Sequence, residues 1–163
     1  MATPEFIVSL REKIGHEQLW LPGVSVVVVA PDGRLLLGRR SDNGAWAVVS
    51  GIPEPGEQPA VAARRECLEE TGVDAEILGV AGVSAGAPIT FPNGDRCVFM
   101  DITFAARADA AAVARARVAD EESTAVGWFA PEALPTPLVG STPGRIDAAL
   151  AWLADPVSGA RFQ

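Results

Sequence analysis

Hydrophobic and polar positions along the chain follow two periods, which predicts strands and helices in a mixed order. Residues 23–30 (GVSVVVVA) form an unbroken, β-branched run that is typical of a strand buried on both faces. A Pro-Asp-Gly turn at 31–33 leads into residues 34–40 (RLLLGRR), and the two runs together predict a hairpin. Four further segments have the composition of strands, at 45–51, 73–85, 96–108 and 124–130.

Beyond the first 20 residues, helical spacing is predicted in two places. Residues 59–71 carry a proline that the first turn tolerates, and Gly72 follows as a stop signal. Residues 144–155 (GRIDAALAWLAD) predict a closing helix, and 108–123 predict a loop with helical tendency. Strands and helices that mix without strict alternation predict an α/β fold with helices packed on a mixed sheet.

The first 20 residues are expected to form a helical extension to a domain spanning 21–156, with 157–163 as a tail. Within the extension an apolar stripe repeats at helical spacing, formed by Phe6, Ile7, Leu10 and Ile14. Two interpretations stay open: the stripe packs against its own domain, or it forms the contact of a homodimer. At 163 residues the chain is long enough for one such domain with a core of its own.

Charge and composition exclude several function classes. The formal net charge of −8 repels a nucleic-acid backbone, so no nucleic-acid polymer is expected as a partner. Cys67 and Cys97 are too few for a disulfide framework and are expected as small buried side chains. No signal peptide opens the chain, and its longest apolar run is too short to cross a membrane. A cytoplasmic protein without membrane contact is therefore expected.

Three carboxylates lie together on the helix predicted at 59–71. On a helical wheel Glu66, Glu69 and Glu70 fall within one arc, and the same wheel places Val61 and Leu68 opposite, on the expected core side. Like charges at this spacing destabilise a helix by roughly a few tenths of a kcal/mol per pair. A divalent cation would reverse that effect, and hard oxygen ligands suit Mg²⁺ or Mn²⁺. The alternative is an ordinary solvated helix face.

The residues around these carboxylates form a longer pattern. Gly51 is followed after five residues by Glu57 and after seven more by RECLEETGV at 65–73. This pattern resembles the signature of the Nudix hydrolases, with every fixed position present and Cys67 in an apolar slot that an aliphatic residue usually fills. The resemblance implies an α/β/α sandwich around a mixed sheet, with the motif forming a loop–helix–loop.

The resemblance also implies a reaction, the magnesium-assisted hydrolysis of a nucleoside diphosphate linked to another moiety. In such a site Glu66, Glu69 and Glu70 are the metal ligands, with Glu69 also counted among the catalytic groups, and the backbone carbonyl of Gly51 joins them. Mn²⁺ is expected to substitute for Mg²⁺. An acidic site binds an anionic pyrophosphate only with cations between them, which agrees with this ligand set.

Other catalytic roles follow from the same resemblance. Glu57 and Arg65 are expected to pair and to fix the loop onto the helix. Glu122, six residues before Trp128, is the candidate general base, with Glu121 as its competitor. Both glutamates are equally consistent with simple loop charges.

Substrate contacts are expected before the motif. Arg39 and Arg40 end a predicted strand, and alternation sends one of them to the site and the other outward. Trp46 and Trp20 are candidates for stacking on a base, although buried core positions are the favoured interpretation of both.

The substrate itself is indicated only by small clues. The chain has no tyrosine, which excludes the tyrosine associated with the diadenosine polyphosphate branch, and Pro88 has a spacing similar to a proline of many ADP-ribose pyrophosphatases. Pro88 is equally what a turn would use. ADP-ribose or a nucleotide sugar is the favoured substrate, with (deoxy)nucleoside triphosphates as the alternative. A catalytically idle nucleotide-binding module is the hypothesis from another class.

Overall fold

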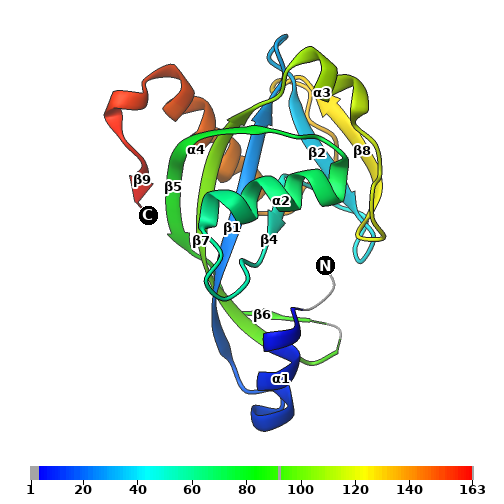
Figure 1. Cartoon of the computed structure of the whole chain (residues 1–163), viewed down its shortest axis with the longest axis vertical. Coiled ribbons are helices and arrows are strands. Elements are labelled where there is room, and N and C mark those ends of the chain that lie inside the picture. The colour runs from blue at the N-terminus through cyan, green and yellow to red at the C-terminus, as the bar shows by residue number, and fades with distance from the viewer. Residues whose placement is uncertain (1–3, 92, 163) are drawn as a thin grey trace.

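A mixed sheet organises the part of the chain that the computed structural model describes, residues 4–91 and 93–162 (Figure 1). Its strands are β1 (Leu19–Val29), β2 (Leu35–Arg40), β3 (Trp46–Ala47), β4 (Val49–Gly51), β5 (Glu76–Ala85), β6 (Ile89–Thr90), β7 (Arg96–Arg107), β8 (Ser123–Phe129) and β9 (Arg161–Phe162). The helices are α1 (Glu5–Ile14), α2 (Pro59–Thr71), α3 (Ala110–Arg115), α4 (Thr142–Ala154) and the short 3-10 helix η1 (Pro156–Ser158).

Strands β1 and β7 form the centre of the sheet. They run parallel in continuous register, from Leu19 opposite Cys97 to Val29 opposite Arg107. The sheet order is β3-β2-β1-β7-β5-β9, while β4 pairs with β1, β6 with β7 and β8 with β2. Residues 24–28 of β1 are buried, which confirms the strand expected from the continuous apolar run. The hairpin of β1 and β2 is also confirmed, with Gly33 at φ 86° in its turn.

Helices α2 and α4 cover the two faces of the sheet. One core cluster joins α2 and α3 to residues such as Val26, Val28 and Phe104, and a second joins α4 to residues such as Val27 and Ala105. Val26, Val27 and Val28 alternate between the clusters because successive side chains of a strand point to opposite faces. The fold is thus the expected α/β/α sandwich around a mixed sheet.

The orientation of α2 differs from the prediction. Val61 and Leu68, expected in the core, are 57% and 48% exposed, whereas Ala62, Ala63 and Cys67 are buried. The small side chains let the helix approach the sheet closely, and the larger aliphatic ones are left outside. The prediction failed because it assigned the core face by size of apolar side chain, and the acidic face instead turns inward.

The N-terminal segment packs on its own domain in part. Ile7 of α1 is buried against Leu21, Ile52 and Cys97 with Phe6 beside it, whereas Leu10 and Ile14 remain exposed. The first interpretation of the stripe therefore holds for its first two residues, and a homodimer contact through the others stays a prediction.

Strand β1 begins at Leu19, inside the segment expected as an extension. Leu19 and Leu21 lie in the cluster beneath α1, and Trp20 between them points to the other face and is 60% exposed. The expectation of a buried Trp20 was wrong, because strand alternation gave the core positions to its neighbours.

Two segments that were expected to be irregular contain short elements. Within 108–123 the helix α3 forms, and the Asp109 side chain caps it by accepting a hydrogen bond from the Ala112 backbone N–H at 2.7 Å. In the segment expected as a tail, β9 pairs in parallel with β5, with Gly82 opposite Arg161.

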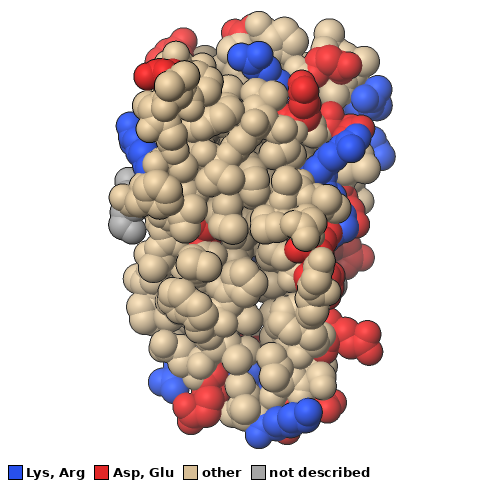
Figure 2. All heavy atoms as spheres, turned by 60° about the vertical axis from the view of Figure 1, so that its left-hand side comes forward, with Lys and Arg blue, Asp and Glu red and all other residues tan. Residues whose placement is uncertain are grey.

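The surface carries its charges mainly along margins in the view of Figure 2. Uncharged side chains cover most of the face shown there, and the described basic side chains on that face form no continuous block. None of the described helices combines the length and the apolar character that a membrane crossing requires.

Candidate active site

The site is built around the inward face of α2. Glu66 and Glu70 lie one turn apart on this face and are only 6% and 8% exposed. Strand β4 approaches so closely that a Cβ atom at Gly51 would lie 2.1 Å from Cδ of Glu66. Only glycine leaves room for this carboxylate against the strand, which explains the glycine that opens the motif.

Arg65 connects the loop and the helix. Its Nε and Nη2 donate hydrogen bonds to Oε1 and Oε2 of Glu57, both at 2.9 Å, so the expected pair is present in a two-pronged geometry. Its Nη1 donates to Oε1 of Glu66 and to Oε2 of Glu69, each at 3.0 Å. Glu57 also accepts the Glu54 backbone N–H at 3.0 Å. One guanidinium therefore holds the 52–58 loop and balances part of the carboxylate charge.

The carboxylates of the site have different environments. The hydrogen bonds from Arg65 lower the pKa of Glu57. Burial raises the pKa of Glu66, although the adjacent Arg65 opposes this shift. Burial raises the pKa of Glu70 to about 8, with further contributions from Glu66 and Asp120. Glu70 is thus the carboxyl group whose charge is least compensated by its protein surroundings.

Two buried carboxylates that repel each other suit a hard divalent cation. Mg²⁺ is commonly held by one or two carboxylates together with substrate phosphates and water, and Glu66 and Glu70 with the Gly51 carbonyl fit this donor set. Among residues 4–91 and 93–162, however, no three acidic, cysteine or histidine side chains converge closely enough to hold a metal ion. Glu69 is exposed and turned toward Arg65, so it would have to leave that contact to join the other two.

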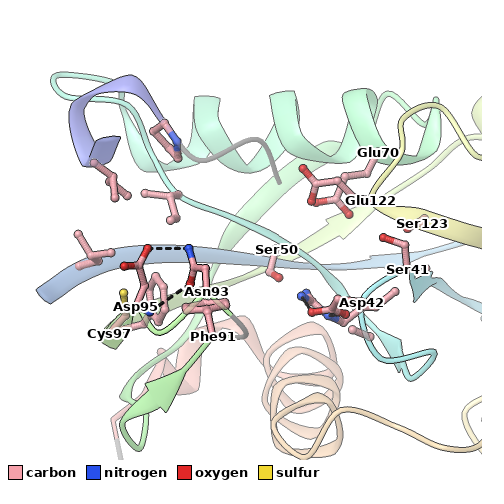
Figure 3. Close-up of a pocket in the computed structure, with 18 of the residues that line it drawn as sticks. Ser41, Asp42, Ser50, Glu70, Phe91, Asn93, Asp95, Cys97, Glu122 and Ser123 are labelled. Carbon is pink, nitrogen blue, oxygen red and sulfur yellow. Dashed lines mark hydrogen bonds and ion pairs between the residues drawn. The ribbon is translucent and has the colours of Figure 1, made fainter. Parts of the chain in front are cut away.

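A cavity of about 370 Å³ opens beside Glu70 (Figure 3). Glu70 from α2 and Glu122 from the loop before β8 lie close together at one end, with Ser41 and Asp42 across from them. Ser50 of β4 lines the middle. Glu122 lines this cavity and Glu121 does not, so the geometry distinguishes the two candidates for the general base.

The two arginines of β2 separate as alternation predicts. Arg40 lines the cavity, whereas Arg39 donates from Nε to the Gly44 carbonyl at 3.0 Å. Arg40 also binds Asp42 in a two-pronged geometry, with Nε to Oδ1 at 2.9 Å and Nη2 to Oδ2 at 2.6 Å. Hydrogen bonding to Asp42 raises the pKa of Arg40, so its charge is permanent.

Trp46 packs in the core. Its ring meets Phe129 edge-on, with centroids 4.9 Å apart, in the core cluster beneath α4. It is not among the described residues that line the cavity. This packing agrees with the interpretation of Trp46 as a core aromatic.

Several residues of the cavity have no signal in the sequence. Ser41 and Asp42 flank the carboxylate end, Ser50 lines the middle, and α1 together with the β6–β7 turn supplies the opposite end. Ser41 and Asp42 belong to a short polar turn, and Ser50 is a single polar residue of strand β4. Only the pairing of β2 with β8 and of β1 with β4 brings them to one place.

Comparison with known proteins points to one family. The family model of the NUDIX domain matches residues 19–150. A MutT-like protein of Streptomyces ambofaciens is 37% identical over 109 residues, which cover 67% of this chain and 63% of that protein. An RNA pyrophosphohydrolase of Caulobacter vibrioides is 48% identical over 62 residues, 36% of either chain. The chain spans less than two thirds of the length of both relatives.

Solved structures share the fold at lower identity. An ADP-ribose pyrophosphatase from Streptococcus suis matches with a TM-score of 0.66 and 19% identity, over 88% of this chain and 98% of that one. At this identity the likeness concerns the arrangement of the sheet and helices.

Proposed function

From the membership of this chain in the Nudix family, we propose that it hydrolyses a pyrophosphate bond in a nucleoside diphosphate linked to another moiety, with Mg²⁺ or Mn²⁺ as cofactor. The observation that carries this proposal is the placement of buried Glu70 at the end of a cavity that Glu122 and Arg40 also line. A binding module without chemistry has no need to keep a carboxyl group buried at an energetic cost.

The metal would be held by Glu66, Glu70 and the carbonyl of Gly51, with Glu69 joining after release from Arg65. When bound there, a divalent cation supplies neutralisation of the phosphate charge and a lowered pKa for water. Arg65 and Glu57 keep the 52–58 loop, which directly follows Gly51 of β4, in position against α2. Glu122 accepts a proton from the attacking water, and Arg40 binds a phosphate oxygen at the cavity wall.

ADP-ribose and nucleotide sugars are the substrates that we propose first. The absence of tyrosine and the position of Pro88 support this order. (Deoxy)nucleoside triphosphates are the alternative. RNA belongs in the same comparison because the relative from Caulobacter vibrioides is an RNA pyrophosphohydrolase, although the negative charge of this chain opposes RNA binding.

Glu70→Gln is the variant that tests catalysis, because it keeps the shape of the side chain and removes its negative charge. With magnesium and the preferred substrate, we expect the kcat/KM of Glu70→Gln to fall by about a hundredfold or more. The control Glu76→Gln changes an exposed carboxylate of β5, and its kcat/KM is expected to remain within about twofold of the wild type. The rates come from product release measured with ADP-ribose, nucleotide sugars, (deoxy)nucleoside triphosphates and RNA. Equal turnover by wild type and Glu70→Gln would refute the assignment, and nucleotide binding without turnover would favour the non-catalytic module.

A further inference from the structure

The end of the cavity far from Glu70 is walled by a segment outside the matched family domain. The family model begins at residue 19, whereas Pro4, Ile7 and Arg11 of the preceding segment line the cavity. The opposite wall comes from the β6–β7 turn, with Phe91 and Asn93, and from Phe99 of β7. This chain therefore completes its cavity with a helix of its own.

Helix α1 is held firmly enough to act as a wall. Ile7 is buried against Leu21, Ile52 and Cys97. Arg11 donates from Nη1 to the carbonyls of Gly15 at 3.0 Å and Glu17 at 2.6 Å. These contacts close the end of the helix.

Arg11 also ties α1 to the sheet. Its Nη2 donates to the Arg96 carbonyl at 3.0 Å and to Sγ of Cys97 at 3.4 Å. Its Nε lies 3.2 Å from Oδ1 of Asp95. All four Nη hydrogens are thereby engaged and are not available to a phosphate, while the buried Nε–H lies beside Asp95 without a hydrogen bond to the described residues.

The acidic group at this end is also compensated. Asp95 lies 2.9 Å from Nδ1 of His16, and its Oδ2 accepts a hydrogen bond from Nδ2 of Asn93 at 2.9 Å. With Arg11 beside it, the carboxylate is balanced by groups of the protein. The far end of the cavity therefore attracts neither a phosphate nor a bare cation.

The remaining lining at this end is apolar and aromatic. It includes Ile7, Leu21, Ile52, Phe91 and Phe99, together with Pro4 and Cys97. Aromatic side chains offer π-faces to flat heterocycles, and such stacking is tolerant of base identity, whereas an aliphatic neighbour discriminates by shape. The two ends of the cavity thus suit the two ends of a nucleotide, a charged phosphate near Glu70 and an uncharged ring system near α1.

We propose that the end of the cavity formed by α1, Phe91 and Phe99 is the subsite for the nucleobase and its sugar, and that Ile7 selects among bases. This inference rests on the proposed function for the placement of the phosphates near Glu70. Helix α1, which lies outside the matched domain, would then determine which bases the cavity accepts.

Binding of nucleoside monophosphates to the full chain tests the subsite without relying on hydrolysis. The dissociation constants of AMP, GMP, CMP and UMP are measured by titration calorimetry in millimolar magnesium, with inorganic pyrophosphate as the ligand that lacks a base. We expect Phe91→Leu to weaken the best-bound monophosphate by about tenfold, because base–aromatic stacking is lost. We expect Ile7→Ala to change the ratio between purine and pyrimidine ligands, and neither variant to alter pyrophosphate binding by more than about twofold.

Controls separate this subsite from general damage. Leu10→Ala changes an exposed residue of the same helix and is expected to leave every dissociation constant unchanged. Ile7→Met, which nearly conserves volume, replaces Ile7→Ala if thermal melts show that the alanine variant does not fold. Equal weakening of nucleotides and pyrophosphate, or no change in any of them, would overturn the subsite. Altered nucleotide binding in a protein that hydrolyses nothing would instead refute the proposed function and leave the subsite standing.

Discussion

Glu70 is a residue whose favoured protonation state differs with and without a bound cation. Its carboxyl group is enclosed by protein, with Glu66 on the same helix face and Asp120 contributing further repulsion. A bound divalent ion would favour the ionised form, whereas the protein alone favours the protonated one. The same features that make Glu70 costly in the metal-free protein therefore prepare it as a ligand.

The metal-free protein should lose stability as Glu70 ionises. Its pKa is raised from 4.5 to about 8, so below pH 4.5 the group is protonated in the folded and the unfolded chain alike. Between these values the unfolded chain releases its proton first, and the free energy of unfolding falls by an amount on the order of a few kcal/mol by the time pH 8 is passed. Glu70→Gln removes this loss.

Urea unfolding in EDTA at pH 5.5 and 8.5 measures the effect as the difference between wild type and Glu70→Gln. We expect the variant to gain relative stability at the higher pH. Parallel behaviour of the two proteins at both pH values would contradict the assigned environment of Glu70.

At the scale of the element, α2 is unusual because its largest aliphatic side chains face solvent. Ala62 and Ala63 pack against the sheet, and Thr71 closes the buried stripe by donating its hydroxyl to the Cys67 carbonyl. The helix ends at Gly72, whose φ of 69° is the left-handed conformation that glycine adopts at low cost. Close packing of these small side chains keeps Glu66 near Gly51. Larger side chains between the helix and the sheet would push the helix away.

Two variants of α2 test which face is packed. Ala63→Leu inserts a larger side chain into a fully buried position and should destabilise the protein by about 1–3 kcal/mol. Leu68→Gln changes an exposed position and should remain within about 0.5 kcal/mol of the wild type. Denaturant midpoints with unchanged slopes provide both values. A larger loss of unfolding free energy in Leu68→Gln than in Ala63→Leu would show that the opposite face of α2 is the buried one.

At the scale of the whole molecule, the site joins segments that are far apart in the sequence. Strand β4 and α2 supply the carboxylate end. The end of β2 supplies Arg40, the loop before β8 supplies Glu122, and α1 with β7 supplies the apolar end. A cation bound at the carboxylate end stabilises only the folded chain, in which these segments are assembled.

Metal binding should therefore raise the melting temperature. A ligand at a hundredfold excess over its Kd stabilises a fold by about 2.7 kcal/mol, which for a chain of this length corresponds to roughly 5–10 °C. Thermal melts in EDTA and in millimolar magnesium measure the shift, with Glu76→Gln expected to match the wild type and Glu70→Gln to shift much less. An unshifted wild type would mean that Arg65 already compensates the carboxylates.

The sequence by itself determined the features that depend on local pattern. A continuous run of β-branched residues favours a strand with both faces covered, so residues 24–28 were predictable as a strand buried on both faces. The Pro-Asp-Gly turn and the end of α2 before Gly72 follow from the backbone preferences of single residues. The motif from Gly51 to Val73 also identified the family, because its spacing specifies a loop and a helix together.

Only the tertiary structure decided which way the side chains of these elements face. The choice of Arg40 over Arg39, the outward turn of Val61 and Leu68, and the inward turn of Glu70 depend on which neighbour each element packs against. The contribution of α1 to the cavity depends on Arg11 reaching Asp95 across 83 intervening positions, roughly half the chain. A periodic pattern defines the faces of an element, but the contacts formed on folding select the one that is buried.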